Sequence, residues 1–358
     1  MLPFLVGKAI SARTRDIATM NSYTQPGEQD EISERADKAA LFLERLFEQL
    51  PNMLTEHEEH ERGFRVRCYE RWKDGIDLLK MFIVISEEFG STLNGRERPR
   101  AVLQVDYKFG SAIMLHARGV RVANEILALL REGYPDGALS RWRTLHEIAV
   151  VSTFLNRSEP ETSLRFLAHR GIAAYKALKQ YDEYLPRSRM KPLDPGDLDA
   201  AKAERDKLLA RFGTEFGEDF GWAYPTITKK KEINLFDLEK ATGLDHWRSR
   251  FRWASDDIHA SAKPPFASLG TSEVRRDKPV LLTGSSNSAF TDPAHMCAIS
   301  LNLANHSIPE EYLTDFEKVL LGSLRILSDR LGETFLKIEN ETRSLSAEAS
   351  RDVGVGKD

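Results

Sequence analysis

Apolar residues recur along most of the chain at the three- and four-residue spacing of amphipathic helices. Over residues 64–89, for example, Trp72, Ile76 and Leu79 fall on one face, which is the period of a helix that packs on one side. Sustained two-residue alternation is absent, and only residues 279–284 are candidates for a brief strand or an extended loop. The pattern predicts an all-α fold, a multi-helix bundle with irregular loops and at most a very short strand pair.

The most apolar part of the chain predicts an antiparallel helical hairpin. We expect residues 102–131 to form one long helix and residues 138–156 to form the next. The intervening residues 133–137, Gly-Tyr-Pro-Asp-Gly, are turn formers and leave room only for a tight turn. The two helices must then lie side by side in opposite directions, and we expect this hairpin to be the core of the bundle.

Helix-breaking residues set several other boundaries. Pro51 is expected to interrupt the first helical stretch, and Gly90 to end the next one before a polar loop at 91–100. Asp292, followed by Pro293, predicts an N-cap and the first turn of a helix. The remaining helices are expected at 28–50, 52–60, 160–184, 197–212, 235–242 and 309–341.

These elements group into four segments. A mixed N-terminal arm precedes the first helical pattern, and a tail rich in Ser, Ala, Gly and Lys, which we expect to be disordered, follows the last one. The predicted segments are the N-terminal arm (1–27), an N-terminal helical region (28–100), the main helical bundle domain (101–342) and the disordered tail (343–358).

The composition narrows the class of protein. With 358 residues, 41% of them hydrophobic and 30% charged, the chain fits an ordinary globular protein with a substantial core. The net charge of −4 gives no global DNA signature. Two distant cysteines exclude a disulfide framework and make a structural zinc site unexpected. No run is long and apolar enough for a membrane helix, so we expect a cytoplasmic protein without a metal or cofactor.

The candidate chemistry centres on residues 248–259, which we expect to form one helix with two neighbouring stripes. The apolar stripe consists of Trp247, Phe251, Ala254 and Ile258. The polar stripe consists of Arg248, Arg252, Ser255 and His259, with Asp256 beside it. Side chains three, four and seven residues apart share a helix face, so a guanidinium, a hydroxyl, a carboxylate and an imidazole should converge at the edge of the core.

This polar stripe fits a metal-independent ribonuclease. His259 could carry the proton transfers at near-neutral pH, and Arg252 could neutralise the developing phosphorane charge. Asp256 and Ser255 would orient the histidine. Phosphate contacts and stacking with RNA would come from Arg248, Arg250 and Trp247. The competing interpretation is structural: Arg252 and Asp256 form an ion pair while His259 caps the helix.

A second polar group lies on the predicted hairpin, in the stretch from Arg141 to Glu147. Glu147 stands in an otherwise apolar helix, so we expect its carboxylate to be at least half-buried and to need a partner. Arg143, four residues earlier, and Arg121 on the facing helix are the candidates. Together with His146 these residues would support the same cleft as His259, or else form a buried Arg–Glu network that only fixes the register of the hairpin.

The Arg143-x-x-x-Glu147 and Ser255-x-x-x-His259 signatures resemble an uncharacterised bacterial family of all-helical proteins over about residues 105–310. A wider resemblance is to the HEPN superfamily of helical nucleases, found in toxins and phage-defence systems, whose motif is Arg, four to six residues, then His. The spacing occurs twice, from Arg141 to His146 and from Arg252 to His259. The residue after each arginine is a tryptophan, where HEPN nucleases often carry a polar residue. The HEPN resemblance implies an RNA substrate and a homodimer.

The sequence therefore supports two functions. The first is a HEPN-like metal-independent endoribonuclease, in a toxin or phage-defence setting. The alternative is a non-catalytic helical module that binds a partner or small ligand, with the Arg/Glu/His cluster as scaffold. Metal-dependent hydrolysis is disfavoured because no convergent His, Asp and Glu spacing lies on one helix face. Of two further motifs, the glycine-containing residues 283–287 are expected to be an ordinary loop and Lys229–Lys231 a surface loop.

Overall fold

The computed structural model describes residues 28–228, 232–256, 258–259, 267–273 and 281–352. Within these ranges the chain is helical and forms no strand, which confirms the predicted all-α fold. Residues 281–284 lie in a loop, and residues 279–280, like the arm 1–27 and Lys229–Lys231, lie outside the described residues. The helices are α2 (Glu28–Gln104), α3 (Tyr107–Arg131), α4 (Pro135–Arg157), α5 (Pro160–Ala168), α6 (Arg170–Ser188), α7 (Asp197–Phe212), α8 (Leu235–Thr242), α9 (Arg248–Ser255), α10 (Thr291–His306) and α11 (Asp315–Asp352).

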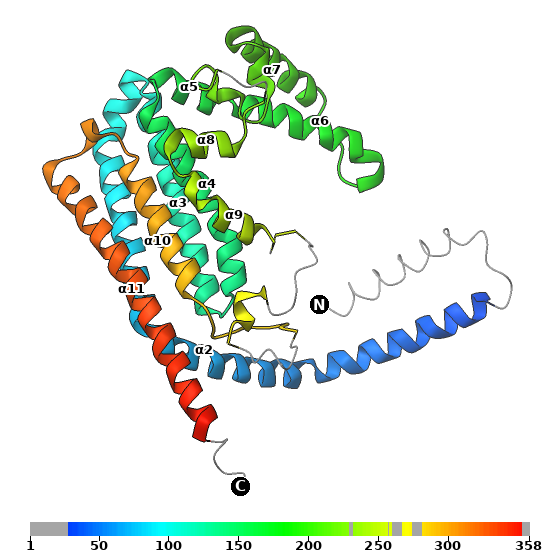
Figure 1. The fold of residues 1–358 in the computed structure, drawn as a ribbon. Helices are drawn as coiled ribbons and strands as arrows, with labels where there is room; N and C mark the ends of the chain where they lie inside the picture. Colours follow the sequence, from blue (N-terminus) through cyan, green and yellow to red (C-terminus); the bar gives the residue numbers. More distant parts are fainter. Residues whose placement is uncertain (1–27, 229–231, 257, 260–266, 274–280, 353–358) are drawn as a thin grey trace. The chain divides into compact units, whose positions relative to one another are not determined.

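The chain divides into two units, residues 1–64 and residues 65–358. In the first unit, the described part of α2 over residues 34–62 has its side chains exposed, apart from the half-exposed Leu50. In the second unit, the rest of α2 packs into a bundle with α3, α4, α10 and α11 (Figure 1). The hydrophobic core therefore belongs to residues 65–358.

The predicted hairpin is confirmed as the centre of the bundle. α3 and α4 pack along each other, and α10 lies against both of them and against α11. Gly133 turns the chain between the hairpin helices with a φ of 79°, and the Tyr134 amide donates to the Leu129 carbonyl at 2.8 Å. Trp142 on α4 is fully buried and its indole N–H donates to Ser300 Oγ on α10 at 2.9 Å. The helix α10, distant in sequence, thus completes the core of the hairpin.

Aromatic packing joins α2 to the last two helices. The Trp72 ring stacks on Phe290, with ring centroids 4.9 Å apart, and lies 5.6 Å from the Phe335 ring of α11. The Trp72 indole N–H also donates to the Asn287 carbonyl at 3.3 Å. Residues 283–287 therefore form a structural loop, as expected, and Ser286 ties it to the hairpin turn through the Gly133 carbonyl.

The predicted boundaries of the N-terminal helices are wrong. Pro51 and Gly90 both lie inside α2, which continues through the predicted loop 91–100 to Gln104. Pro51 costs one backbone hydrogen bond, which an exposed helix tolerates when its neighbours remain helical. Gly90 fits because α3 approaches closely there: a Cβ at this position would stand 2.2 Å from the His116 ring. Close packing, and not a helix end, explains this glycine.

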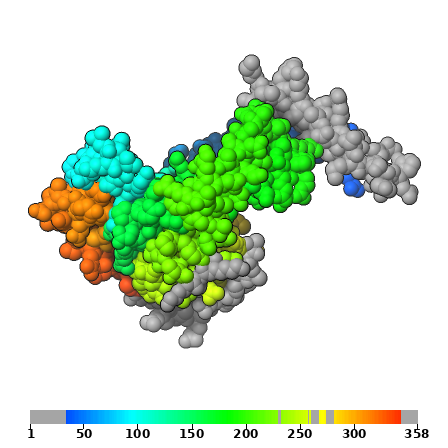
Figure 2. Space-filling view, turned by 90° about the horizontal axis from the view of Figure 1, so that it is seen from above, coloured from blue at the N-terminus to red at the C-terminus, as the bar shows by residue number. Residues whose placement is uncertain are grey.

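α6 and α7 project from the bundle, and α5, which packs on α3, connects them to it (Figure 1, Figure 2). The helix expected at 160–184 is split at His169 into α5 and α6, and α7 packs back along α6. After α7 the chain forms two short turns of 3₁₀ helix, η1 (Thr214–Gly217) and η2 (Gly221–Ala223). Arg165 holds this irregular segment, since its buried guanidinium donates to the carbonyls of Trp222, Gly221 and Phe212.

Candidate functional site

The candidate site lies where α8 and α9 pack on the outer side of α4. α8 begins with a capping box in which Asn234 and Asp237 exchange hydrogen bonds, and it ends at Gly243 in the left-handed conformation. α9 follows after a single 3₁₀ turn and buries Phe251 and Ala254. These short helices bring Glu239 and Arg248 to the polar residues of α4.

A buried carboxylate forms the base of the site. Glu239 is fully buried, and its oxygens lie 3.1 Å from His146 Nε2 and 3.2 Å from Arg248 Nη1. A carboxylate only accepts, so Nε2 of His146 carries the proton in this bond. Arg248, about one-third exposed, carries the charge that compensates the carboxylate. The three residues join α4, α8 and α9.

This cluster excludes the first of the two predicted Arg–His pairs. His146 is buried and bonded to Glu239. Arg141 lies elsewhere on α4, paired with Glu125 of α3 and donating to Thr144 Oγ1 at 3.2 Å. Arg141 and His146 therefore do not face one common space, and Arg141 fixes the register of the hairpin instead.

Two further expectations about the hairpin are wrong. Glu147 is exposed, because its position on α4 turns away from α3 and α10. Arg121 is also exposed, with 83% of its side chain accessible, and pairs with Glu125 on its own helix at 3.4 Å. The predicted contact between Arg121 and Glu147 is absent from the described residues.

Arg143 differs from the other polar residues of the site because it contacts an aromatic ring and has a buried nitrogen without a hydrogen bond. Its guanidinium lies 4.3 Å from the centre of the Phe251 ring, and the Arg248 guanidinium lies 5.0 Å from the same ring. Arg143 Nε is buried without a hydrogen-bond partner, and across the described residues the side chain forms no ion pair. Burial lowers the pKa of Arg143, the nearby Glu147 opposes this, and Arg248 lowers it further. The arginine stays charged, so two positive groups share one aromatic ring.

The predicted helix over 248–259 ends early. α9 stops at Ser255, whose hydroxyl donates to the Phe251 carbonyl at 2.8 Å and so does not orient a histidine. Beyond it, the His259 amide still reaches the Ser255 carbonyl in a turn, at 3.2 Å. Arg252, Asp256 and His259 are all exposed. Ile258, expected on the apolar stripe, is 49% exposed.

Of the side chains predicted to contact RNA, some already have partners within the protein. Arg250 pairs with Asp292 at 2.7 Å. The prediction of Asp292 as an N-cap is wrong, because Asp292 lies within α10 and Phe290 occupies the N-cap position. Trp247 is half-buried beside the His246 ring. Across the described residues, the side chains of Arg252 and His259 form no hydrogen bond or ion pair. The available groups on this surface are thus Arg143, Arg252 and His259.

Sequence reasoning missed Glu239. The signal is present, because Leu235, Glu239 and Thr242 share one face of α8, and a carboxylate on the packed face of a helix needs a partner. The partner could not be identified from sequence, since His146 and Glu239 are far apart along the chain.

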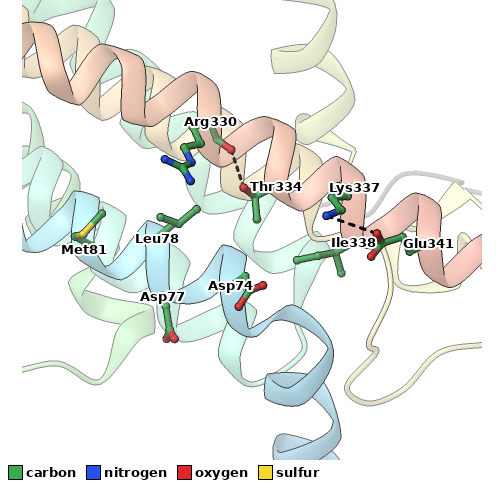
Figure 3. A pocket seen from close by; sticks show the side chains of 9 residues that line it. All are labelled: Asp74, Asp77, Leu78, Met81, Arg330, Thr334, Lys337, Ile338 and Glu341. Atoms are coloured by element: carbon green, nitrogen blue, oxygen red, sulfur yellow. Dashed lines mark hydrogen bonds and ion pairs between the residues drawn. The ribbon is translucent and has the colours of Figure 1, made fainter.

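A different pocket, of about 490 Å³, lies between α2 and α11 (Figure 3). Some of its polar groups are engaged within their own helices: Asp77 accepts from Tyr69 and Lys73, and Thr334 donates to the Arg330 carbonyl. Across the described residues, no buried unsatisfied donor or acceptor lines this pocket. The surface where α9 packs on α4, which carries Arg143, Arg252 and His259 (the α4–α9 surface), is the stronger candidate because Arg143 Nε is such a donor. Among the described residues, no three His, Cys, Asp or Glu side chains lie close enough together to hold a metal ion.

The comparisons with known proteins give one match. The model of a family of unknown function (DUF5677) matches residues 111–274, a range that includes all of α4, α8 and α9. This match supports the predicted likeness to an uncharacterised family. No curated protein and no solved structure matches the chain. None of the described helices is long and apolar enough to cross a membrane.

Proposed function

We propose that the α4–α9 surface binds a phosphate-bearing ligand, and that the ligand class is single-stranded RNA. The observation that carries this proposal is the half-buried Arg143 guanidinium, which shares the Phe251 ring with the Arg248 guanidinium and, across the described residues, forms no ion pair. A phosphate would place negative charge between the two guanidinium groups, and the planar guanidinium of Arg143 suits phosphate geometry.

The neighbouring side chains extend this surface along α9. Arg252 is one turn beyond Arg248 and exposed, so it can make a further phosphate contact. Trp253 is half-exposed and offers a face for base stacking. Arg248 itself is committed to Glu239 and acts chiefly by holding α9 in place.

A second candidate function is cleavage of the bound RNA without a metal ion. The observation in its favour is that Arg252 on α9 and His259 in the turn after it are both exposed. His259 would take or donate a proton and Arg252 would stabilise the phosphorane. The HEPN likeness, a homodimeric site, a cytoplasmic location and a phage-defence role belong to this second proposal.

Binding is tested with a short fluorescent single-stranded RNA in buffer without divalent metal. Arg143→Gln and Arg252→Gln should each weaken binding by about tenfold, the typical effect of losing a charge-assisted contact. Arg121→Gln is the control, because it removes an exposed arginine of α3 that pairs with Glu125 on its own helix and makes no contact with Phe251. Equal affinity of wild type, Arg143→Gln and Arg121→Gln would rule out this binding site.

Cleavage is read from the same samples on a denaturing gel. The second candidate predicts that wild type shortens the RNA and that His259→Ala and Arg252→Ala do not, with unchanged thermal melts. Binding without cleavage by the wild type leaves the non-catalytic module as the function. Both variants alter exposed residues, so a lower melting temperature would contradict their placement on the surface.

A further inference from the structure

A cavity of about 1010 Å³ opens in the angle between α3 and the projecting helices α6 and α7. This volume is at the upper end of the range of about 300–1,000 Å³ that small-molecule sites occupy. The cavity is separate from the α4–α9 surface: Arg143, Arg252 and His259 do not line it. Its walls come from five segments, α3, α5, α6, α7 and η2.

The walls of the cavity are mainly apolar. Aliphatic and aromatic side chains from four of these segments face the space: Met114, Leu164, Leu167, Leu208 and Trp222. At its edge, Met114 and Tyr107 are 46% and 38% exposed. Apolar side chains left exposed around a concave surface mark a place that an apolar group would cover.

The charged residues around the cavity are mostly arginines. Arg118 of α3, Arg170 of α6 and Arg211 of α7 line it, together with a single carboxylate, Glu204. Across the described residues, none of these three arginines forms a hydrogen bond or an ion pair through its side chain, and Arg211 only lies over the Phe212 ring. His169 adds no charge near neutral pH, because burial lowers its pKa.

Arg165 provides an internal comparison. This arginine lies next to the cavity but is buried, and the fold satisfies it with three backbone carbonyls and the rings of Phe212 and Phe216. The three arginines of the cavity, which come from three different helices, are exposed and receive no such partners. Their guanidinium groups are therefore open to an anionic group at the mouth of an apolar space.

We propose that this cavity binds a single-chain amphiphile, with an apolar chain against the leucines and Trp222 and an anionic phosphate or carboxylate head at Arg118, Arg170 and Arg211. The arginines would supply charge-assisted hydrogen bonds to the head group. The chain would cover Met114 and Leu167, which removes apolar surface from water. This proposal is independent of RNA binding at the α4–α9 surface.

The test uses dodecyl phosphate as the probe, kept below the concentration at which it forms micelles, with binding to the full chain followed by calorimetry. Dodecyltrimethylammonium, which has the same chain and a positive head, should bind at least about tenfold more weakly, a difference that corresponds to about 1.4 kcal/mol. Equal binding of the two amphiphiles would overturn the proposal, because it would reduce the interaction to apolar adsorption. Failure of dodecyl phosphate to bind would overturn it as well.

Two matched pairs of variants locate the binding. Ala173→Trp places an indole in the cavity, whereas Ala174→Trp alters the adjacent exposed residue that does not line it. The first should abolish binding of dodecyl phosphate and the second should not. Arg118→Gln should weaken binding about tenfold, and Arg121→Gln on the same helix should leave it unchanged. Equal effects within either pair would overturn the assignment to this cavity, and unchanged RNA binding by Ala173→Trp would show that the two sites are separate.

Discussion

His116 makes the bundle sensitive to acid through a single buried imidazole. The ring is 3% exposed, and its Nε2 lies 2.9 Å from Asn305 Oδ1, while the Asn305 amide donates to Ser86 Oγ. Burial lowers the pKa of His116 from 6.5 to about 4, and the bond to Asn305 opposes this only in part. The folded protein therefore holds this histidine neutral at a pH where an unfolded chain would protonate it.

The lowered pKa of His116 makes the folded protein less stable as the pH falls. Between pH 6.5 and about 4 the unfolded chain binds the proton and the folded protein does not, so stability falls as the pH falls through this window. The full loss from this group is about 3 kcal/mol. Thermal melts across the window should show a smaller loss for His116→Gln, which keeps a donor for Asn305 but does not titrate. Parallel pH profiles for variant and wild type would contradict the assignment.

Glu239 gives a second prediction for a single buried residue. Glu239→Ala leaves buried His146 without its partner and Arg248 without its carboxylate, and removing one member of a buried charged group costs about 3–5 kcal/mol. Glu147→Ala removes an exposed carboxylate from α4 and should change stability by less than about 0.5 kcal/mol. Urea unfolding of the two variants measures both values, and similar losses would show that Glu239 is not a structural centre.

Residue spacing predicted part of the candidate site. It placed Arg248 and Arg252 on one face of a helix and Phe251 on the packed face. All three residues lie in α9, and Phe251 is buried. It misplaced Glu147, because an isolated carboxylate in an apolar stretch can face either the core or solvent, and the direction depends on helices that are distant in sequence. The contact of Glu239 with His146 could not be predicted for the same reason.

Helix boundaries failed where tertiary contacts outweigh local propensity. Residues 91–100 look like a polar loop, but Leu93 is fully buried and Arg96 pairs with Glu317 of α11 at 2.7 Å. These contacts stabilise a helix that the composition of the segment does not favour. α9 shows the opposite case, since its periodic pattern continues to His259 while the helix ends at Ser255. Asp256, Ile258 and His259 beyond it are exposed, so burial of these side chains does not favour a longer helix.

The crossing of α2 and α3 yields a prediction for two glycines of one helix. Gly90→Ala would place a Cβ 2.2 Å from the buried, hydrogen-bonded ring of His116, and such overpacking costs about 1–3 kcal/mol. Gly95→Ala meets nothing within 4 Å on the same helix and should stabilise by up to about 1 kcal/mol. Opposite shifts in melting temperature are expected. A stabilising Gly90→Ala would mean that α2 and α3 do not approach closely.

Helices that are neighbours in the bundle are not always neighbours along the chain. α10 lies against α3, α4 and α11, although helices α5–α7 and the site helices α8 and α9 intervene in sequence. The antiparallel hairpin could be predicted because its turn is short. The position of α10 could not, since a long connection leaves many packing arrangements open.

The division of the chain into two units leads to a truncation experiment. Residues 34–62 contribute no fully buried side chain, and the core residues begin at Cys68. A variant that begins at Arg65 should therefore unfold cooperatively, with a melting temperature within a few degrees of the full chain. Circular dichroism measures this directly. A large loss of stability would show that residues before Arg65 belong to the folded core.

We infer that Arg143 contacts a phosphate of bound RNA, because its guanidinium lies beside that of Arg248 and, across the described residues, forms no ion pair. The most direct test is the salt dependence of RNA affinity for wild type and Arg143→Gln, measured by fluorescence anisotropy between about 50 and 200 mM salt. We expect Arg143→Gln to bind RNA about tenfold more weakly, and the slope of log affinity against log salt to fall by about 0.7, the loss of one phosphate contact on a single strand. An unchanged affinity and slope in Arg143→Gln would contradict it.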